Sequence, residues 1–192
     1  VKSAKIKVQK TGEHFFLRNA KTLLVIASLL VYSKIFFLSG LTHLDDSIFI
    51  YDKQEFNKHF SNILKTFNIG CFNEKDIYYR PLFLCLFIVE YPFTRHSYSL
   101  YHFVSIALHC FNVLLLYSFL KKINIAKHVS FIYSLIFAVH PVLTMAVAWI
   151  PGVNDLLLTT FTLSFLLIVL RYCDSQEPKD FLLQIFLYFL CV

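Results

Sequence analysis

Two adjacent carboxylates, Asp45 and Asp46, follow the first long apolar run and are the first residues whose types could do chemistry. Carboxylates at a membrane boundary are costly unless they are solvated, paired or metal-bound. One of them could take a proton from an acceptor hydroxyl, or the pair could help to hold a divalent cation such as Mg²⁺ or Mn²⁺. Adjacent side chains point in different directions, so at most one would be the base. The alternative is a polar loop start or helix cap without chemistry.

A basic residue stands before a proline in the sequence Tyr78-Tyr79-Arg80-Pro81. The guanidinium is planar, stays charged and binds phosphate through two hydrogen bonds, so Arg80 suits a phosphate at a membrane surface. The alternative is that Arg80 reaches lipid headgroups. Lys53 and Arg95 are weaker candidates for the same role.

A third group of polar residues lies in or beside apolar segments. His102 and His109 are seven residues apart, so they lie on nearly one helix face, and Asn112 follows them. Polar side chains within a membrane span usually bond to a neighbouring helix, and this structural role is the interpretation we favour. His140 and Asp155 complete the set, and Asp155 could instead cap a helix.

The composition identifies the environment of these residues. The chain has 192 residues, of which 57% are hydrophobic and 16% charged, with 22 Phe and 11 Tyr. Soluble domains carry roughly 25% charged residues, so this chain could not cover its apolar surface with polar groups. Disorder, collagen-like repeats and a disulfide scaffold are excluded. The sequence also lacks HExxH, Walker, GxSxG and Rossmann motifs and any nucleic-acid-binding module.

Long uncharged runs predict an all-α, polytopic transmembrane helical bundle. A helix of 20 residues reaches about 30 Å, the thickness of the hydrocarbon core. Pro141, Pro151 and Gly152 indicate that the third helix ends near His140. The predicted membrane helices are residues 22–40, 98–120, 129–147 and 154–171, with the start of a fifth at 181–192. That last run leads us to expect a fragment of a longer protein.

Basic residues give the orientation. They cluster in the N-terminal segment 1–21 and in the short connections 121–128 and 171–180, which the positive-inside rule places in the cytoplasm. The net charge of +6 therefore indicates a membrane flank and no nucleic-acid partner.

Residues 41–97 are then an external loop. Apolar residues at three- and four-residue steps from Phe49 to Phe67 predict an amphipathic juxtamembrane helix, and Pro81 to Val89 predicts a second, with Pro81 in its first turn. A disulfide between Cys71 and Cys85 is an open alternative to free thiols.

Four segments carry a family resemblance: LDDSIFIYD (44–52), YYRPLFLCLFIVEY (78–91), YHFVSIALHCFN (101–112) and HPVLTMAVAWIPGVNDLL (140–157). Their order and spacing resemble the N-terminal half of the C-type membrane glycosyltransferases, which use polyprenyl- or dolichyl-phosphate sugars. This superfamily includes the protein O-mannosyltransferases. The resemblance is closest to the O-mannosyltransferase-like branch that often carries tetratricopeptide repeats.

The resemblance implies an inverting transfer of a sugar, with a mannose-like hexose expected, from a polyprenyl-phosphate carrier to a hydroxyl of a protein or glycan on the external or luminal side. It implies that Asp45 or Asp46 is the catalytic base and that Arg80 holds the carrier phosphate. The other residues expected to bind substrate or lipid phosphate are Tyr79, Lys53, Arg95, His102, His140 and Asp155. The partners are then membrane lipid, the carrier-linked sugar and the acceptor. The location is a bacterial inner membrane or the endoplasmic reticulum membrane.

The chain departs from the family pattern at three places. Leu143-Thr144-Met145 stands where relatives often have His-Thr-Glu, Val153 stands where an arginine is common, and Ser105 replaces an expected asparagine. These changes permit an alternative function, a non-catalytic membrane scaffold or accessory subunit with the same fold. A transporter is disfavoured because charges within the predicted spans are nearly absent apart from Lys34.

Overall fold

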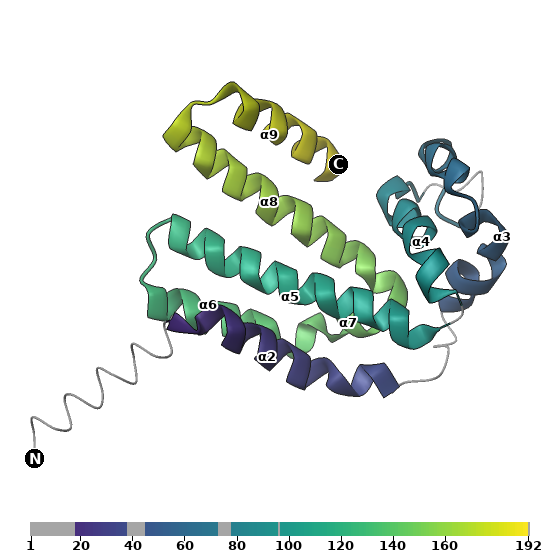
Figure 1. Cartoon of the computed structure of the whole chain (residues 1–192), viewed down its shortest axis with the longest axis horizontal. Coiled ribbons are helices and arrows are strands. Elements are labelled where there is room, and N and C mark those ends of the chain that lie inside the picture. The colour runs from purple at the N-terminus through teal and green to yellow at the C-terminus, as the bar shows by residue number, and fades with distance from the viewer. Residues whose placement is uncertain (1–17, 38–44, 73–77, 96, 192) are drawn as a thin grey trace, which may run out of the picture. The chain divides into compact units, whose positions relative to one another are not determined.

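The computed structural model describes residues 18–37, 45–72, 78–95 and 97–191, and these residues form helices and no strand (Figure 1). The predicted all-α fold is confirmed. The described residues form two compact units. Unit 1 contains residues 18–31, 109–143 and 160–191, and unit 2 contains residues 32–37, 45–72, 78–95, 97–108 and 144–159.

Three helical segments of the described chain are long and apolar enough to cross a membrane. The first is Ala20–Phe37, formed by α2 (Ala20–Tyr32) and the 3-10 helix η1 (Ser33–Phe37). The second is α5 (Tyr98–Lys122), and the third, Ile150–Ser175, joins the 3-10 helix η5 (Ile150–Gly152) to α8 (Val153–Ser175). At 1.5 Å per residue, the 25 residues of α5 reach about 37 Å.

A fourth candidate span is bent. Helix α6 (Lys127–Val139) is followed by the 3-10 helix η4 (Pro141–Leu143) and by α7 (Thr144–Ala148), with a bend of 46°. Proline lacks the amide hydrogen that α6 would need, and it holds the preceding His140 in an extended conformation (φ −69°, ψ 127°). The helix therefore ends at Val139, next to His140, near which the sequence predicts its end.

Small side chains and buried polar bonds hold the helices of unit 1 together. Ala20 and Leu24 of α2 are buried in one cluster with Val113 of α5 and Ala138 of α6. The ring nitrogen Nε2 of His109 lies 3.1 Å from the carbonyl oxygen of Ala138. Small residues allow membrane helices to approach closely, and polar side chains bond between them.

The Asn112 side chain makes the corresponding bond to α8. Its Oδ1 accepts a hydrogen bond of 2.7 Å from the Thr160 hydroxyl. His109 and Asn112 therefore have the structural role that we favoured from the sequence.

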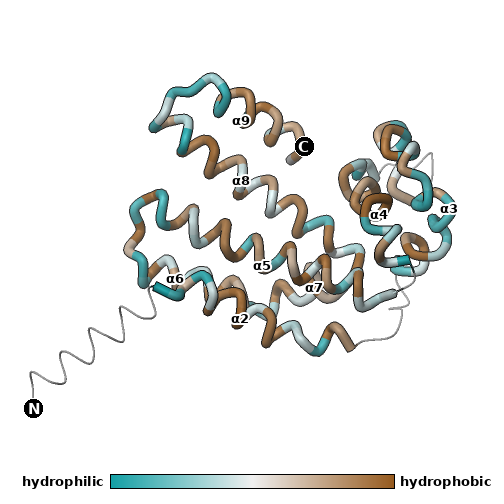
Figure 2. The backbone as a smooth tube through the Cα atoms, in the orientation of Figure 1, coloured by the Kyte–Doolittle hydropathy of each residue, from teal (hydrophilic) through white to brown (hydrophobic). Residues whose placement is uncertain are grey.

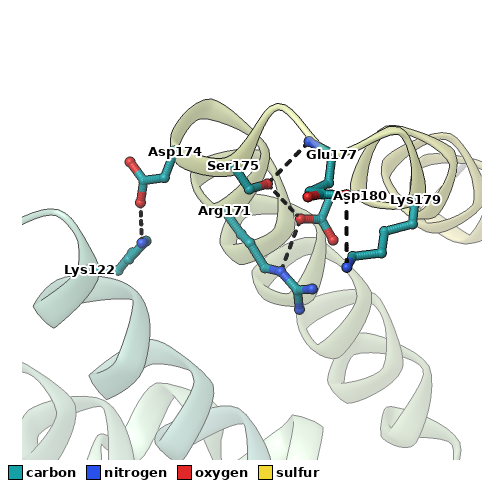
Figure 3. A network of polar contacts seen from close by, with 7 residues as sticks. All are labelled: Lys122, Arg171, Asp174, Ser175, Glu177, Lys179 and Asp180. Atoms are coloured by element: carbon teal, nitrogen blue, oxygen red, sulfur yellow. Dashed lines mark hydrogen bonds and ion pairs between the residues drawn. The ribbon is translucent and has the colours of Figure 1, made fainter.

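Charged residues gather where the helices of unit 1 turn. Helix α9 (Pro178–Cys191) follows α8 in the opposite direction, and Figure 2 shows a hydrophilic connection between these two helices. Lys122 at the end of α5 pairs with Asp174 at the end of α8 (Figure 3). The pair thus joins the two connections that the positive-inside rule assigns to one side of the membrane.

Unit 2 is built around aromatic side chains from the predicted external loop. Phe49 lies 4.9 Å from Phe83 and 5.5 Å from Phe87 between ring centroids, and Phe87 lies 5.7 Å from Tyr101 of α5. All four side chains are almost fully buried. Edge-to-face and tilted aromatic pairs of this kind stabilise a core beyond their buried area. The contact between Phe87 and Tyr101 packs the loop against the first turns of α5.

The predicted external loop is helical, but its helix is divided into short elements. It contains the π-helix η2 (Ile48–Asp52), α3 (Gln54–Asn57) and the 3-10 helix η3 (Phe60–Asn68). The single continuous helix predicted over residues 49–67 is wrong, because His59 is extended (φ −110°, ψ 110°) and separates α3 from η3.

Helix α4 (Pro81–Thr94) is the second predicted juxtamembrane helix, with Pro81 in its first turn. It extends beyond the predicted end at Val89 and contains Pro92. Cys71 and Cys85 are free thiols, and the Cys85 sulfur lies 3.2 Å from the Thr66 hydroxyl. The disulfide considered from the sequence is therefore not formed.

Candidate functional site

The acidic pair begins the helical segment that enters the core of unit 2. The Asp45 carbonyl accepts hydrogen bonds from the amides of Ile48 (3.1 Å) and Phe49 (3.3 Å). Because Phe49 and Ile50 are buried, this turn holds the two carboxylates beside the aromatic core. Asp45 is half-buried and Asp46 is only 3% exposed, so the two neighbours occupy different environments.

Polar side chains also stand at the start of α5, in the same unit as Asp46. Tyr98 and His102 are one helical turn apart on this helix. His102 is buried, and its Nδ1 has no hydrogen-bond partner among the described residues. Asp46 and His102, two of the predicted site residues, are therefore both buried in unit 2, and Tyr98 lies one helical turn before His102 on α5.

Tyr98 bonds to the segment that the sequence predicts to be an external loop. Its hydroxyl lies 2.6 Å from the hydroxyl of Tyr51 in η2. Sequence reasoning missed both tyrosines, although Tyr51 lies within the LDDSIFIYD segment. The side chains that meet are 47 residues apart in the chain, and no local pattern pairs them.

Arg80 lies at the start of α4. The residue is exposed, and among the described residues its guanidinium lies over the Tyr78 ring, 5.8 Å from the centroid. The Tyr79 hydroxyl donates a hydrogen bond of 3.1 Å to the Phe67 carbonyl, which ties the segment before α4 to η3. A positive side chain next to the amides of a helix N-terminus favours an anion, as the phosphate prediction requires.

The other predicted residues are more dispersed. The Lys53 ammonium lies 5.8 Å from the centroid of the Phe56 ring, and Arg95 ends α4 with a positive φ of 44°. Asp155 is exposed in the first turn of α8. His140 belongs to unit 1, where its Nδ1 accepts a hydrogen bond of 3.2 Å from the Val142 amide.

Glu90 is an acidic residue of unit 2 that sequence reasoning missed as a candidate. It lies in α4 and is 7% exposed, and burial raises the pKa of its carboxyl to about 8. Its charge acts on Tyr101, a member of the aromatic core. The sequence signal is an acid that directly follows the apolar run Pro81 to Val89.

The fit of a metal ion can be judged from the acidic pair. Within the part of the chain that the structure describes, no group of three or more His, Cys, Asp or Glu side chains could hold a metal ion. Mg²⁺ is commonly held by one or two carboxylates together with water and substrate phosphates, so Asp45 and Asp46 stay the predicted ligands. The steps below are assigned to side chains of this chain.

Comparison with known proteins finds relatives that match about half of the chain. The chain is 38% identical over 100 residues, 52% of its length, to protein O-mannosyl-transferase TMTC1 of Homo sapiens. It is 38% identical over 103 residues (53%) to the protein of that name from Mus musculus, and 37% identical over 93 residues (47%) to protein O-mannosyl-transferase F38B6.6 of Caenorhabditis elegans.

These matches cover 11%, 10% and 14% of the three relatives, so the chain spans about a tenth of their length. No family model and no solved structure matches the chain. The relatives support an O-mannosyltransferase-like relationship over about half the chain.

Proposed function

We propose that this chain belongs to a membrane glycosyltransferase that moves a hexose, most simply mannose, from a polyprenyl- or dolichyl-phosphate carrier to a hydroxyl of a protein or glycan on the external or luminal side. The observation that carries the proposal is the buried Asp46 carboxylate, which lies in the same unit as His102 and Arg80. The names of the relatives support the reaction class.

The chemistry needs a base and a phosphate-binding group. A sugar on a lipid phosphate is already activated, so the acceptor oxygen attacks the anomeric carbon as the bond to the phosphate oxygen breaks. The electron pair leaves with the phosphate, and a carboxylate receives the acceptor proton. A guanidinium fixed near the departing phosphate stabilises its developing charge. Asp46 and Arg80 are the groups that we assign to these two roles.

Asp46 is preferred to Asp45 as the base because of its surroundings. Asp46 is 3% exposed whereas Asp45 is half-buried, so the surrounding side chains restrict the Asp46 carboxylate more. Catalytic groups act best when their position is set in advance by neighbouring side chains. Asp45 then orients the turn that carries Asp46.

The test measures sugar transfer in membranes that contain the full-length protein. The donor is dolichyl-phosphate mannose carrying a tritium label, and the acceptors are serine- and threonine-rich peptides. Loss of a general base lowers rates by about 10²–10⁴-fold, so Asp46→Asn should reduce transfer by at least about 10²-fold at equal membrane abundance. Arg80→Ala should raise the KM for the donor.

Asp174→Asn supplies a matched control, because it makes the same substitution at an exposed ion pair outside the site and should retain activity. Wild-type transfer rates in Asp45→Asn, Asp46→Asn and Arg80→Ala would refute the proposal.

A second candidate function is a non-catalytic membrane scaffold or accessory subunit. One observation favours it: Val153, which stands where an arginine is common in the family the sequence resembles, is buried in the aromatic core of unit 2. In this chain the position is structural and offers no charge to a substrate. A scaffold predicts that Asp46→Asn leaves transfer in the membrane unchanged, whereas deletion of the whole protein reduces it.

A further inference from the structure

The 3-10 helix η3 turns polar side chains toward the rest of unit 2. Asn62 and Thr66, four residues apart, are 6% and 0% exposed. Each bonds to the backbone of its own segment: Asn62 donates to the Phe56 carbonyl (2.8 Å) and Thr66 donates to the Ile63 carbonyl (2.7 Å). The buried face of η3 is therefore formed in part by polar side chains whose hydrogen bonds are made locally.

Another face of η3 carries three large apolar side chains. Phe60, Leu64 and Phe67 are 55%, 77% and 46% exposed, and their spacing of four and three residues places them on one face. A single exposed apolar residue is ordinary, but a contiguous apolar surface marks a site of contact with a protein or a membrane. We call these three residues the apolar stripe of η3.

A third face of η3 is polar and exposed. It is formed by Ser61, Lys65 and Asn68, each of which follows a member of the apolar stripe by one residue. Helix η3 thus has one face against unit 2, one apolar face and one polar face with a lysine. A helix that lies along a bilayer surface has this arrangement, with its apolar face beside the acyl chains and Lys or Arg on its polar face.

The ends of the segment that carries η3 lie at a membrane boundary. Unit 2 contains the end of the first candidate span and the start of α5, and the Ser99 hydroxyl of α5 donates a hydrogen bond of 3.0 Å to the Phe36 carbonyl of η1. The segment between these two span ends therefore starts and finishes at the same membrane surface. A lipid bilayer is thus an apolar partner within reach of the stripe.

Two polar contacts connect η3 with the start of α4. The Tyr79 hydroxyl donates a hydrogen bond of 3.1 Å to the Phe67 carbonyl, and the Thr66 hydroxyl lies 3.2 Å from the Cys85 sulfur. Arg80 directly follows Tyr79 in the chain. The depth of η3 in a bilayer would therefore set the depth of the Arg80 guanidinium.

We propose that the apolar stripe of η3 inserts into the headgroup region of the outer or luminal leaflet and holds Arg80 at the depth of the lipid phosphates. The second part of this inference rests on the proposed function, in which Arg80 binds the carrier phosphate. Insertion removes Phe60, Leu64 and Phe67 from water and keeps Lys65 among the headgroups, where its ammonium can meet lipid phosphate.

Lipid contact is measured by site-specific photo-crosslinking of the full-length protein. Benzoylphenylalanine replaces Leu64 or, as the matched control, Ser61, and each protein is irradiated in vesicles of tritium-labelled phosphatidylcholine. We expect severalfold more lipid label at position 64, because Leu64 belongs to the apolar stripe and Ser61 to the polar face. Equal labelling at the two positions, or crosslinks from position 64 to protein in place of lipid, would overturn the insertion and leave the proposed function standing.

The link to Arg80 is measured by transfer kinetics with two donors. Leu64→Asp places a charge in the apolar stripe, and Ser61→Asp makes the same change on the polar face of the same helix. With dolichyl-phosphate mannose in vesicles, Leu64→Asp should raise the KM for the donor by about tenfold, the loss expected when one leucine side chain is no longer buried. Ser61→Asp should leave this KM unchanged. With a water-soluble, short-chain isoprenyl-phosphate mannose the KM should be unchanged in both variants, since this donor does not depend on depth.

Three results separate the parts of the inference. An unchanged KM of Leu64→Asp for the dolichyl donor would overturn the link to Arg80. An equal rise with the soluble donor would also overturn it, because the substitution would then act on the site itself and not on its depth. Inactivity of the wild type with both donors would refute the proposed function, whereas lipid label at position 64 would still support the insertion.

Discussion

Glu90 gives the most quantitative prediction about the stability of unit 2. Its carboxyl is buried in α4, and burial raises its pKa from 4.5 to about 8. A group whose pKa is higher in the folded state contributes stability that is complete below the pKa of the unfolded chain and is lost as the pH rises through the folded value. For Glu90 that loss begins near pH 4.5 and is complete above about pH 8.

The size of the effect follows from the shift. Each pKa unit corresponds to about 1.4 kcal/mol, so the free energy of unfolding falls by on the order of 4 kcal/mol between pH 4.5 and pH 7.4. Glu90→Gln removes this dependence, but the buried amide leaves hydrogen-bonding groups unsatisfied at a cost of about 1–3 kcal/mol. The net gain at pH 7.4 is about 1–3 kcal/mol, or about 2–12 °C in Tm for a chain of this size.

The assay is thermal unfolding of the purified protein in detergent, followed by tryptophan fluorescence at one scan rate between pH 5 and pH 8.5. We expect the Tm of Glu90→Gln to exceed that of the wild type by an amount that grows with pH and levels above pH 8. Glu55→Gln is the control, since Glu55 is exposed and its hydrogen bond with Lys58 lowers its pKa. An equal pH slope in the wild type and Glu90→Gln would refute the burial argument.

Two further predictions concern packing and polar contacts. A Cβ on Gly152 would lie 2.5 Å from the Met145 carbonyl oxygen, so Gly152→Ala should destabilise the protein by about 1–3 kcal/mol, seen as a lower Tm; an unchanged Tm would contradict this contact. Asp180 is buried and accepts hydrogen bonds from Arg171 (3.0 Å) and Ser175 (2.9 Å) (Figure 3). Asp180→Ala should therefore speed hydrogen exchange of the α9 amides, whereas Asp174→Ala at the exposed pair should not; equal exchange in the two variants would show that Asp180 does not fasten α9.

The elements that are local in the chain could be predicted from the sequence. The apolar runs predicted the long helices, because a membrane helix needs about 20 apolar residues in succession. Pro81 marked the first turn of α4, and Pro141 marked the end of α6, because proline lacks an amide hydrogen. Asp45-Asp46 and Arg80 were recognised from residue type and position, and their role in transfer stays a prediction.

The features that depend on tertiary contacts could not be predicted. Hydrophobic periodicity indicates which face of a segment is apolar, but it does not show that Tyr51 meets Tyr98 or that Asp46 is buried while Asp45 is half-exposed. The break at His59 escaped prediction because the apolar spacing continues across it. The raised pKa of Glu90 depends on which side chains exclude water from it, and this is not encoded in the residues next to it in the chain.

The central claim is that Asp46 serves as the base for transfer of a lipid-linked sugar. The most direct measurement is the rate of labelled mannose transfer from dolichyl-phosphate mannose to peptide in membranes with equal amounts of the wild-type protein or Asp46→Asn. We predict clear transfer by the wild type and at least about a 10²-fold lower rate in the variant, with donor binding retained. Equal rates in the two membranes would contradict the account.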